Sequence, residues 1–184
     1  NHWDIPQGLE NIGGWPERDI VHQFVKYSYH VSKHLGDRVR NWITHNEPWC
    51  VSYLGYIEGY KPPGLINKWS KSLATAHHLL LSHGMAIPEI RNNSKQSEIG
   101  ITLNLNTAIP ASGSTYDEDA CRFFDGQFNR LYLNPLYNNE YPDDVFEYLK
   151  TKSLISESDL NFIKQGDLNI ISTKTDFLGV NYYS

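Results

Sequence analysis

The sequence predicts an α/β fold of parallel strands: a partial (β/α)8 TIM barrel, about half of the barrel, in one domain over residues 1–184. Strand-like and helix-like segments alternate along the chain, which is typical of parallel βαβ units. Polar or aromatic residues directly follow each predicted strand, at the end where such barrels carry their active sites. On pattern alone an open doubly wound sheet is the alternative, although no glycine-rich phosphate loop opens any predicted helix.

In the first half of the chain, turn residues and apolar spacing define the elements. Prolines and glycines cluster before the first helix and again after the first strand. Ile20, Phe24 and Val31 recur at helical spacing, and Gly36 stands where a helix commonly ends. The predicted elements are a loop over 5–16, a helix over 17–35, a strand over 39–44 and a long loop over 47–69.

In the second half, two longer helices and two strands are predicted. Leu73, Leu80 and Ile87 form one apolar stripe, and Phe124 and Phe128 form another. The apolar runs between the helices are rich in residues that favour strands. The predicted elements are a helix over 70–91, a strand over 99–105, a helix over 117–132, shorter helices over 143–150 and 157–164, and a strand over 177–182.

Composition excludes several classes of protein. With 40% hydrophobic and 20% charged residues the chain is neither disordered nor collagen-like. The net charge of −5 and scattered basic residues give no reason to expect a nucleic-acid partner. No apolar run is long enough to span a membrane and no signal peptide is visible, so a cytoplasmic location is expected. Cys50 and Cys121 are expected to be reduced and packed.

The two ends of the sequence lie at or within predicted elements. The chain starts at Asn1 without an initiator Met, and it stops directly after an apolar run. Three complete strands plus a strand end near His2 amount to about half of a barrel. We therefore expect a partial chain, whose natural partner is the remainder of its own barrel.

The residues that close the strands are the most informative feature. Because the carboxyl ends of parallel strands meet at one face, these side chains should converge on one polar, aromatic-lined cup. Polyol recognition needs this mixture of hydrogen-bonding groups with flat rings beneath them. The endings are His2-Trp3-Asp4, Thr44-His45-Asn46-Glu47-Pro48-Trp49, Asn104-Leu105-Asn106 and Asn181-Tyr182-Tyr183.

Several of these motifs resemble glycoside hydrolase family 1. Thr44-His45-Asn46-Glu47-Pro48 is similar to the family's acid/base motif, although Phe or Leu is more usual at His45. The resemblance covers essentially the whole chain, about strands 3 to 6 of the barrel. The other matching segments are His2-Trp3-Asp4-Ile5-Pro6-Gln7 with Gly13-Gly14-Trp15, Leu35-Gly36-Asp37-Arg38-Val39, and Asp176-Phe177-Leu178-Gly179-Val180-Asn181-Tyr182-Tyr183.

The resemblance implies a retaining β-glycosidase, specifically a β-glucosidase that removes terminal non-reducing β-D-glucosyl residues by double displacement. Glu47 matches the general acid/base, and Asn46 the amide that binds the sugar 2-hydroxyl. The implied partner is a β-glucoside or oligosaccharide, with no metal or organic cofactor. Other positions also match substrate-site residues: His2 and Trp3 on the glycone side, Trp49 on the aglycone side, and Asn181. Tyr183 matches a tyrosine that forms a hydrogen bond with the nucleophile. Asn104 and Asn106 are weaker candidates for substrate contact.

One expected motif is absent. The family's nucleophilic glutamate lies in a Thr-Glu-Asn-Gly motif, and this sequence contains none. A retaining glycosidase needs two carboxyl groups, so these residues alone are predicted to be inactive.

Three alternatives remain open. A 6-phospho-β-glycosidase is one, although His2-Trp3-Asp4 looks more like the branch that acts on unphosphorylated sugars. A metal-dependent hydrolase would need paired ligands at strand ends, and His2 with Asp4 is the single candidate pair. The third is a non-catalytic, sugar- or protein-binding relative without the nucleophile.

Overall fold

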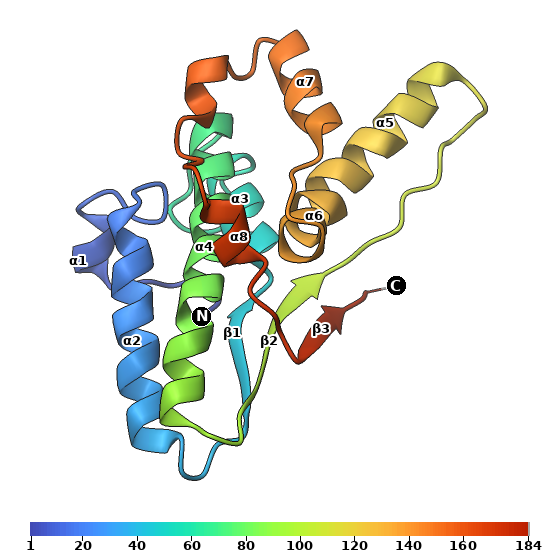
Figure 1. Ribbon diagram of the computed structural model, residues 1–184. Helices are drawn as coiled ribbons and strands as arrows, with labels where there is room; N and C mark the ends of the chain where they lie inside the picture. The colour runs from blue at the N-terminus through green and yellow to red at the C-terminus, as the bar shows by residue number, and fades with distance from the viewer. Residues whose placement is uncertain (184) are drawn as a thin grey trace.

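The computed structural model describes residues 1–183 and is built on a three-stranded parallel sheet (Figure 1). Its strands β1 (Asn41–Asn46), β2 (Glu98–Asn104) and β3 (Phe177–Asn181) lie side by side in sequence order. Both pairings are parallel, and the β2–β3 register sets Asn104 opposite Asn181 at the carboxyl ends. The predicted parallel sheet is confirmed, and it brings three of the predicted polar endings to one edge.

The N-terminal residues extend this edge without forming a regular strand. The N-terminal amine donates to the Thr44 carbonyl at 2.8 Å, and the Asn46 amide donates to the Asn1 carbonyl at 2.9 Å. The expected strand end near His2 therefore lies beside the end of β1.

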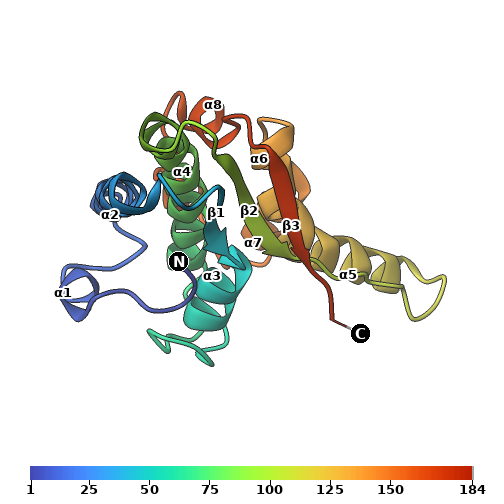
Figure 2. The same cartoon turned by 90° about the horizontal axis from the view of Figure 1, so that it is seen from below.

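Helices α2 (Asp19–Leu35) and α4 (Trp69–Asn93) pack together, and α4 lies against β1 and β2 on one face of the sheet (Figure 2). Both were predicted, and α4 is buried on almost every side along Ser72–Ile90. Gly36 ends α2 with an ordinary helical φ of −66°, so its role differs from that of a left-handed cap. A Cβ there would lie 2.5 Å from the Ser32 carbonyl oxygen, and only glycine allows this close approach.

The predicted loop over 47–69 is wrong in its first part, because α3 (Pro48–Tyr56) is a helix. Pro48 occupies its first turn, where a missing N–H costs nothing. Most of α3 is buried, so its sequence has no polar face to mark a helical period.

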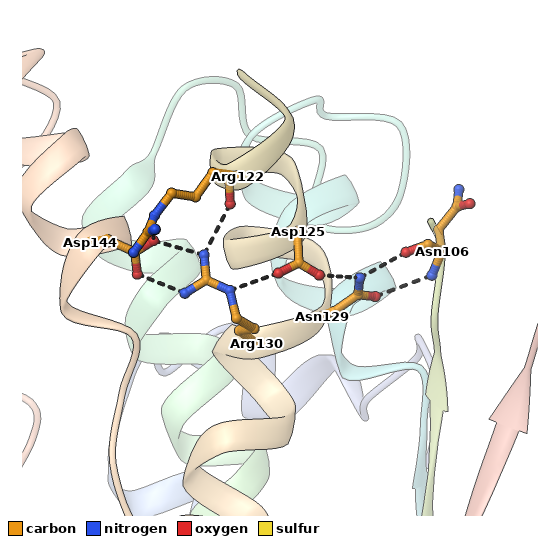
Figure 3. Close-up of polar contacts among 6 residues, drawn as sticks. All are labelled: Asn106, Arg122, Asp125, Asn129, Arg130 and Asp144. Carbon is orange, nitrogen blue, oxygen red and sulfur yellow. Dashed lines mark hydrogen bonds and ion pairs between the residues drawn. The ribbon is translucent and has the colours of Figure 1, made fainter. Parts of the chain in front are cut away.

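The predicted helix over 117–132 is in fact three segments: α5 (Thr115–Asp125), the π-helical turn η1 (Gly126–Arg130) and α6 (Leu131–Tyr137). A network of side chains surrounds the π turn (Figure 3). Arg130 donates to Asp125 and to both carboxylate oxygens of Asp144, each at 2.7–2.8 Å. Asn129 links the same turn to the backbone of Asn106, beyond β2.

The remaining helices are short. Helix α7 was predicted nearly as found, whereas the predicted helix over 157–164 is wrong, because a 3-10 turn of four residues forms there. None of the helices within residues 1–183 is long and apolar enough to cross a membrane. These elements are α1 (Gln7–Glu10), α7 (Asp143–Thr151), the 3-10 turn η2 (Glu157–Leu160) and α8 (Asp167–Ile171).

Two apolar clusters lie on the helix side of the sheet. One joins Leu80 and Leu81 of α4 to Ile101 and Leu103 of β2. The other surrounds Trp15 and the α2–α4 contact. On the opposite face, Ile43 of β1 is 53% exposed, whereas Thr102 and Asn104 of β2 are buried.

Candidate active site

Glu47 stands where β1 ends and α3 begins. Its backbone is left-handed, with φ 52° and ψ 63°, a conformation that costs a non-glycine residue about 1–3 kcal/mol. Its amide donates to the Thr102 carbonyl at 2.8 Å, which fixes the turn against β2. The side chain is buried, with the residue 6% exposed. Strain of this kind is common where a reactive group must be held in place.

The two carboxylate oxygens of Glu47 have different surroundings. Oε1 accepts from Asn181 Nδ2 at 2.8 Å and from Tyr183 Oη at 3.0 Å. Oε2 accepts from the Cys50 thiol at 3.3 Å and lies 3.6 Å from His2 Nε2. Strong donors therefore lie on one side of the carboxylate, and a weak donor and an imidazole lie on the other.

These contacts decide the charge of Glu47. Burial alone would raise the pKa of this carboxyl group, but hydrogen bonds from Asn181, Cys50 and Tyr183 outweigh it and lower the pKa below its ordinary value. In this chain Glu47 is therefore a carboxylate at neutral pH.

The predicted glycone-side residues form a connected group around this carboxylate. Asn181 Nδ2 also donates to Asn46 Oδ1 at 3.0 Å, and the Asn46 carbonyl lies 2.7 Å from His2 Nδ1. The Trp3 ring lies against the His2 ring, with 4.4 Å between centroids, and Lys61 Nζ lies 3.8 Å from the Trp3 centroid. The structure thus brings together His2, Trp3, Asn46, Glu47, Asn181 and Tyr183.

Trp49 belongs to a different group of contacts. Its indole donates to Gln127 Oε1 of the π turn at 3.1 Å. Its ring stacks on Tyr53 at 5.0 Å and packs against Phe128 at 4.3 Å. A place on the aglycone side remains a prediction for this residue.

The two weaker candidates, Asn104 and Asn106, lie in different surroundings. Asn104 is buried, and its amide lies 3.9 Å from the Cys50 sulfur, beside the Glu47 group. Asn106 is exposed and bonds to Asn129, away from Glu47 (Figure 3). The contact between Cys50 and Glu47 was not predicted from the sequence, because it depends on helix α3, which was predicted as a loop.

His45 points away from the site into the helix-side core. It stacks on Phe24 at 4.1 Å and bonds to Ser82 Oγ at 2.8 Å. Burial is the main cause that holds its pKa well below the ordinary value, so the ring is neutral. An aromatic surrounding of this kind suits the Phe that the resemblance leads one to expect there.

The arrangement can bind a polyol and can exchange one proton at Glu47. Within residues 1–183, no group of three or more His, Cys, Asp or Glu side chains is placed to hold a metal ion. Tyr183 matches a residue expected to contact the nucleophile, and in this chain its hydroxyl meets Glu47 instead.

Comparisons with known proteins agree on one family. The sequence model of "Glycosyl hydrolase family 1" matches residues 1–184. "Beta-glucosidase A" of Acetivibrio thermocellus is 40% identical over 183 residues, which are 100% of this chain and 40% of that protein. The 1,4-beta-D-glucan glucohydrolase of Thermotoga neapolitana is 39% identical over 185 residues, 100% of this chain and 41% of that protein.

Solved structures give the same result. A beta-glucosidase from Exiguobacterium marinum superposes with a TM-score of 0.93 at 38% identity, and the match covers 100% of this chain and 41% of that one. A beta-glucosidase from Thermotoga maritima in complex with glucoimidazole has a TM-score of 0.87 at 37% identity, over 100% and 40% of the two chains. The predicted fold, part of a (β/α)8 barrel, is confirmed. This chain spans about 40% of the length of the relatives that it matches.

Proposed function

Because this chain belongs to glycosyl hydrolase family 1, we propose that it supplies the acid/base half of a retaining β-glucosidase. We call these residues, joined to the additional barrel segments that the relatives carry, the complete polypeptide. In the complete polypeptide Glu47 is the general acid/base. The substrate is a terminal non-reducing β-D-glucosyl residue. The nucleophile lies outside these 184 residues.

The observation that carries the proposal is the group of polar side chains around one buried carboxylate. Asn181 and Tyr183 hold Glu47 Oε1 at 2.8 and 3.0 Å, and His2 Nε2 stands 3.6 Å from Oε2. Amide, imidazole and indole groups beside the carboxylate suit the hydroxyls and the apolar face of a pyranose. The same group supports Asn46 as the ligand of the sugar 2-hydroxyl.

The chemistry has two steps. In the first, Glu47 gives its proton to the glycosidic oxygen while a second carboxylate, about 5–5.5 Å away, attacks the anomeric carbon. In the second, Glu47 removes a proton from the water that releases the sugar. The second carboxylate also repels charge on Glu47, which raises its pKa towards the range that a general acid needs. Without it Glu47 is ionised, so these 184 residues alone are expected to be inactive.

Names of relatives support the glucoside as substrate. Several are called beta-glucosidases, and one solved relative is described as bound to its substrate analog salicin. We extend that substrate class to the complete polypeptide. We propose no resident metal and no organic cofactor, and we propose a cytoplasmic location.

The test is kinetics of the complete polypeptide with aryl β-glucoside, β-galactoside and 6-phospho-β-glucoside, before and after exhaustive chelation. We expect the β-glucoside to be preferred and chelation to leave the rate unchanged. Preference for the phosphorylated sugar would place the protein in the phospho-specific branch. Loss of activity on chelation would favour the metal-dependent alternative. No turnover of any of the three would indicate a non-catalytic relative.

Glu47→Gln tests the assigned residue. For a substrate with a poor leaving group, loss of the proton donor should lower kcat/KM by about 100-fold or more. Azide, an anion that needs no base, should restore turnover of an aryl glucoside and should give the β-glucosyl azide. The matched control is Glu58→Gln, which lies beyond the far end of α3 and should keep wild-type activity. Full activity of Glu47→Gln would contradict the assignment.

A further inference from the structure

The unequal surroundings of the two Glu47 oxygens point to a residue that the family resemblance did not assign. Building on the proposed function, we propose that Cys50 is a positioning residue for Glu47: its thiol holds Oε2 weakly, so that Oε2 carries the catalytic proton. The thiol is buried, at 8% residue exposure, and its sulfur lies 3.3 Å from Oε2.

A chain of hydrogen bonds orients the thiol. Asn104 Nδ2, at the carboxyl end of β2, lies 3.9 Å from the Cys50 sulfur and donates to it. With its lone pairs engaged from that side, the sulfur directs its own hydrogen towards Oε2. Cys50 is in the first turn of α3, three residues after Glu47, so the same helix start fixes both groups. A thiol is a weak donor, and it can rotate away at small cost when Oε2 acquires its own hydrogen.

Oε1 is unsuited to carry the proton. It already accepts from Asn181 at 2.8 Å, and in this chain also from Tyr183 at 3.0 Å, so a hydrogen there would displace a stronger donor than the thiol. On the other side, the 2.7 Å contact between His2 Nδ1 and the Asn46 carbonyl requires the hydrogen on Nδ1, because a carbonyl can only accept. The hydrogen on Nδ1 leaves Nε2 as the ring nitrogen that faces Oε2, at 3.6 Å.

The proposed step balances without any further reactant. As the O–H bond at Oε2 breaks, the proton passes to the glycosidic oxygen, whose bond to the anomeric carbon breaks. The second carboxylate forms the new bond to that carbon. In the next step water replaces the carboxylate, and its proton returns to Oε2.

Cys50 remains a neutral donor throughout this cycle. Burial, together with the hydrogen bond to Glu47 and its charge, raises the pKa of the thiol to about 12, while Lys61 opposes the shift. The titratable or charged groups that face the Glu47–Cys50 pair are His2 from the N-terminal segment, Tyr183 from beyond β3, Lys61 from the α3–α4 loop and Tyr132 from α6.

The test compares Cys50→Ser, Cys50→Ala and Cys50→Val in the complete polypeptide, with Cys121→Ser, on α5, as the matched control. The readout is the basic limb of the pH profile of kcat/KM for an alkyl β-glucoside, whose poor leaving group requires the protonated acid. A serine hydroxyl is the stronger donor to a carboxylate, so Cys50→Ser should move this limb to lower pH by about half a unit or more. Alanine and valine remove the donor and should move it to higher pH by a similar amount.

Opposite shifts of the basic limb in Cys50→Ser and in Cys50→Ala or Cys50→Val would distinguish a positioning role of Cys50 from a packing role. Valine fills the site without a donor, so a purely structural role would lower activity in all variants and leave the limb in place. Unchanged limbs in active, folded Cys50 variants would overturn the inference while leaving the proposed function intact. If the wild-type polypeptide hydrolyses no glycoside, the proposed function fails. The inference is then tested by titration of a ¹³C-labelled Glu47 carboxyl group, whose midpoint should move in the same directions.

Discussion

At the scale of single residues, the site is a balance between groups that stabilise charge on Glu47 and groups that oppose it. Asn181, Cys50 and Tyr183 donate to its carboxylate and outweigh burial, so its pKa lies below the ordinary value. A general acid needs the opposite shift. The missing contribution is a second negative charge, which the complete barrel is proposed to supply.

Tyr183→Phe tests this balance in the present chain. Removal of one donor to Oε1 stabilises the neutral acid relative to the carboxylate, so the Glu47 pKa should rise by about half a unit or more. Titration of the labelled carboxyl group by ¹³C NMR measures the change. Tyr182→Phe, at the neighbouring exposed ring, serves as control. A fall in the Glu47 pKa, or an equal rise in the control, would contradict the account.

Much of this group was predictable because the carboxyl ends of neighbouring parallel strands lie side by side. His2, Asn46, Glu47 and Asn181 follow from that rule once the strands are placed. The contact with Cys50 was not predicted, because it depends on a helix that the sequence analysis placed in a loop.

At the scale of elements, amphipathic helices were predictable and buried or interrupted ones were not. Helix α2 has a clear apolar stripe, and its predicted bounds differ from the observed Asp19–Leu35 by two residues at most. Helix α3 is mostly buried and has no polar face, so its sequence shows no helical alternation of apolar and polar residues. The π turn η1 left no signal either, since one extra residue within a helix barely alters the apolar spacing.

The network around η1 should stabilise the contacts of Trp49. Arg130 holds Asp125 and Asp144, and the same turn presents Gln127 and Phe128 to the indole. Arg130→Met should reduce the free energy of unfolding by about 1 kcal/mol, because it removes the ion pairs to Asp125 and Asp144, although Asp144 keeps its pair with Arg122.

Urea unfolding of the complete polypeptide, followed by tryptophan fluorescence, measures this change. Arg38→Met is the control, since its partner Asp37 is fully solvated and the pair should contribute little. Equal effects of the two substitutions would show that the network has no special role.

At the scale of the whole molecule, buried imidazoles make the fold sensitive to acid. Burial lowers the pKa of His83 to about 3, and His77 is lowered to about 4 despite its bond to Asp167. Each ring is neutral in the folded chain, whereas an unfolded chain takes up the proton near pH 6.5. The unfolded state therefore binds more protons as pH falls below about 6.5, and the folded state is progressively destabilised down to the folded pKa.

His83→Gln should make the free energy of unfolding less dependent on pH. The wild-type polypeptide should lose about 1 kcal/mol of stability per pH unit for each such histidine between pH 6.5 and 4. The variant should lose less over the same interval, as measured by urea unfolding at pH 7 and pH 5. His34→Gln, on the exposed end of α2, is the control. Parallel curves for wild type and His83→Gln would contradict the prediction.

The open sheet leads to a prediction for the 184 residues in isolation. Ile43 and Val180 are each 53% exposed. Within the described residues the outer edge of β3 is unpaired, and the outer edge of β1 is paired only at its end, with Asn1. Exposed edges and apolar faces promote association between copies. We expect self-association and binding of an apolar dye, and sedimentation measures the former. A stable monomer without dye binding would show that the partial barrel is self-sufficient.

The left-handed backbone at Glu47 lowers the stability of the fold at the residue that the proposed reaction needs. Its φ of 52° suits glycine or asparagine better than glutamate. Replacing Glu47 by glycine should therefore relieve backbone strain, and under the proposed function it would remove the proton donor. The glutamate at this position therefore lowers the stability of the fold, and the proposed reaction requires it.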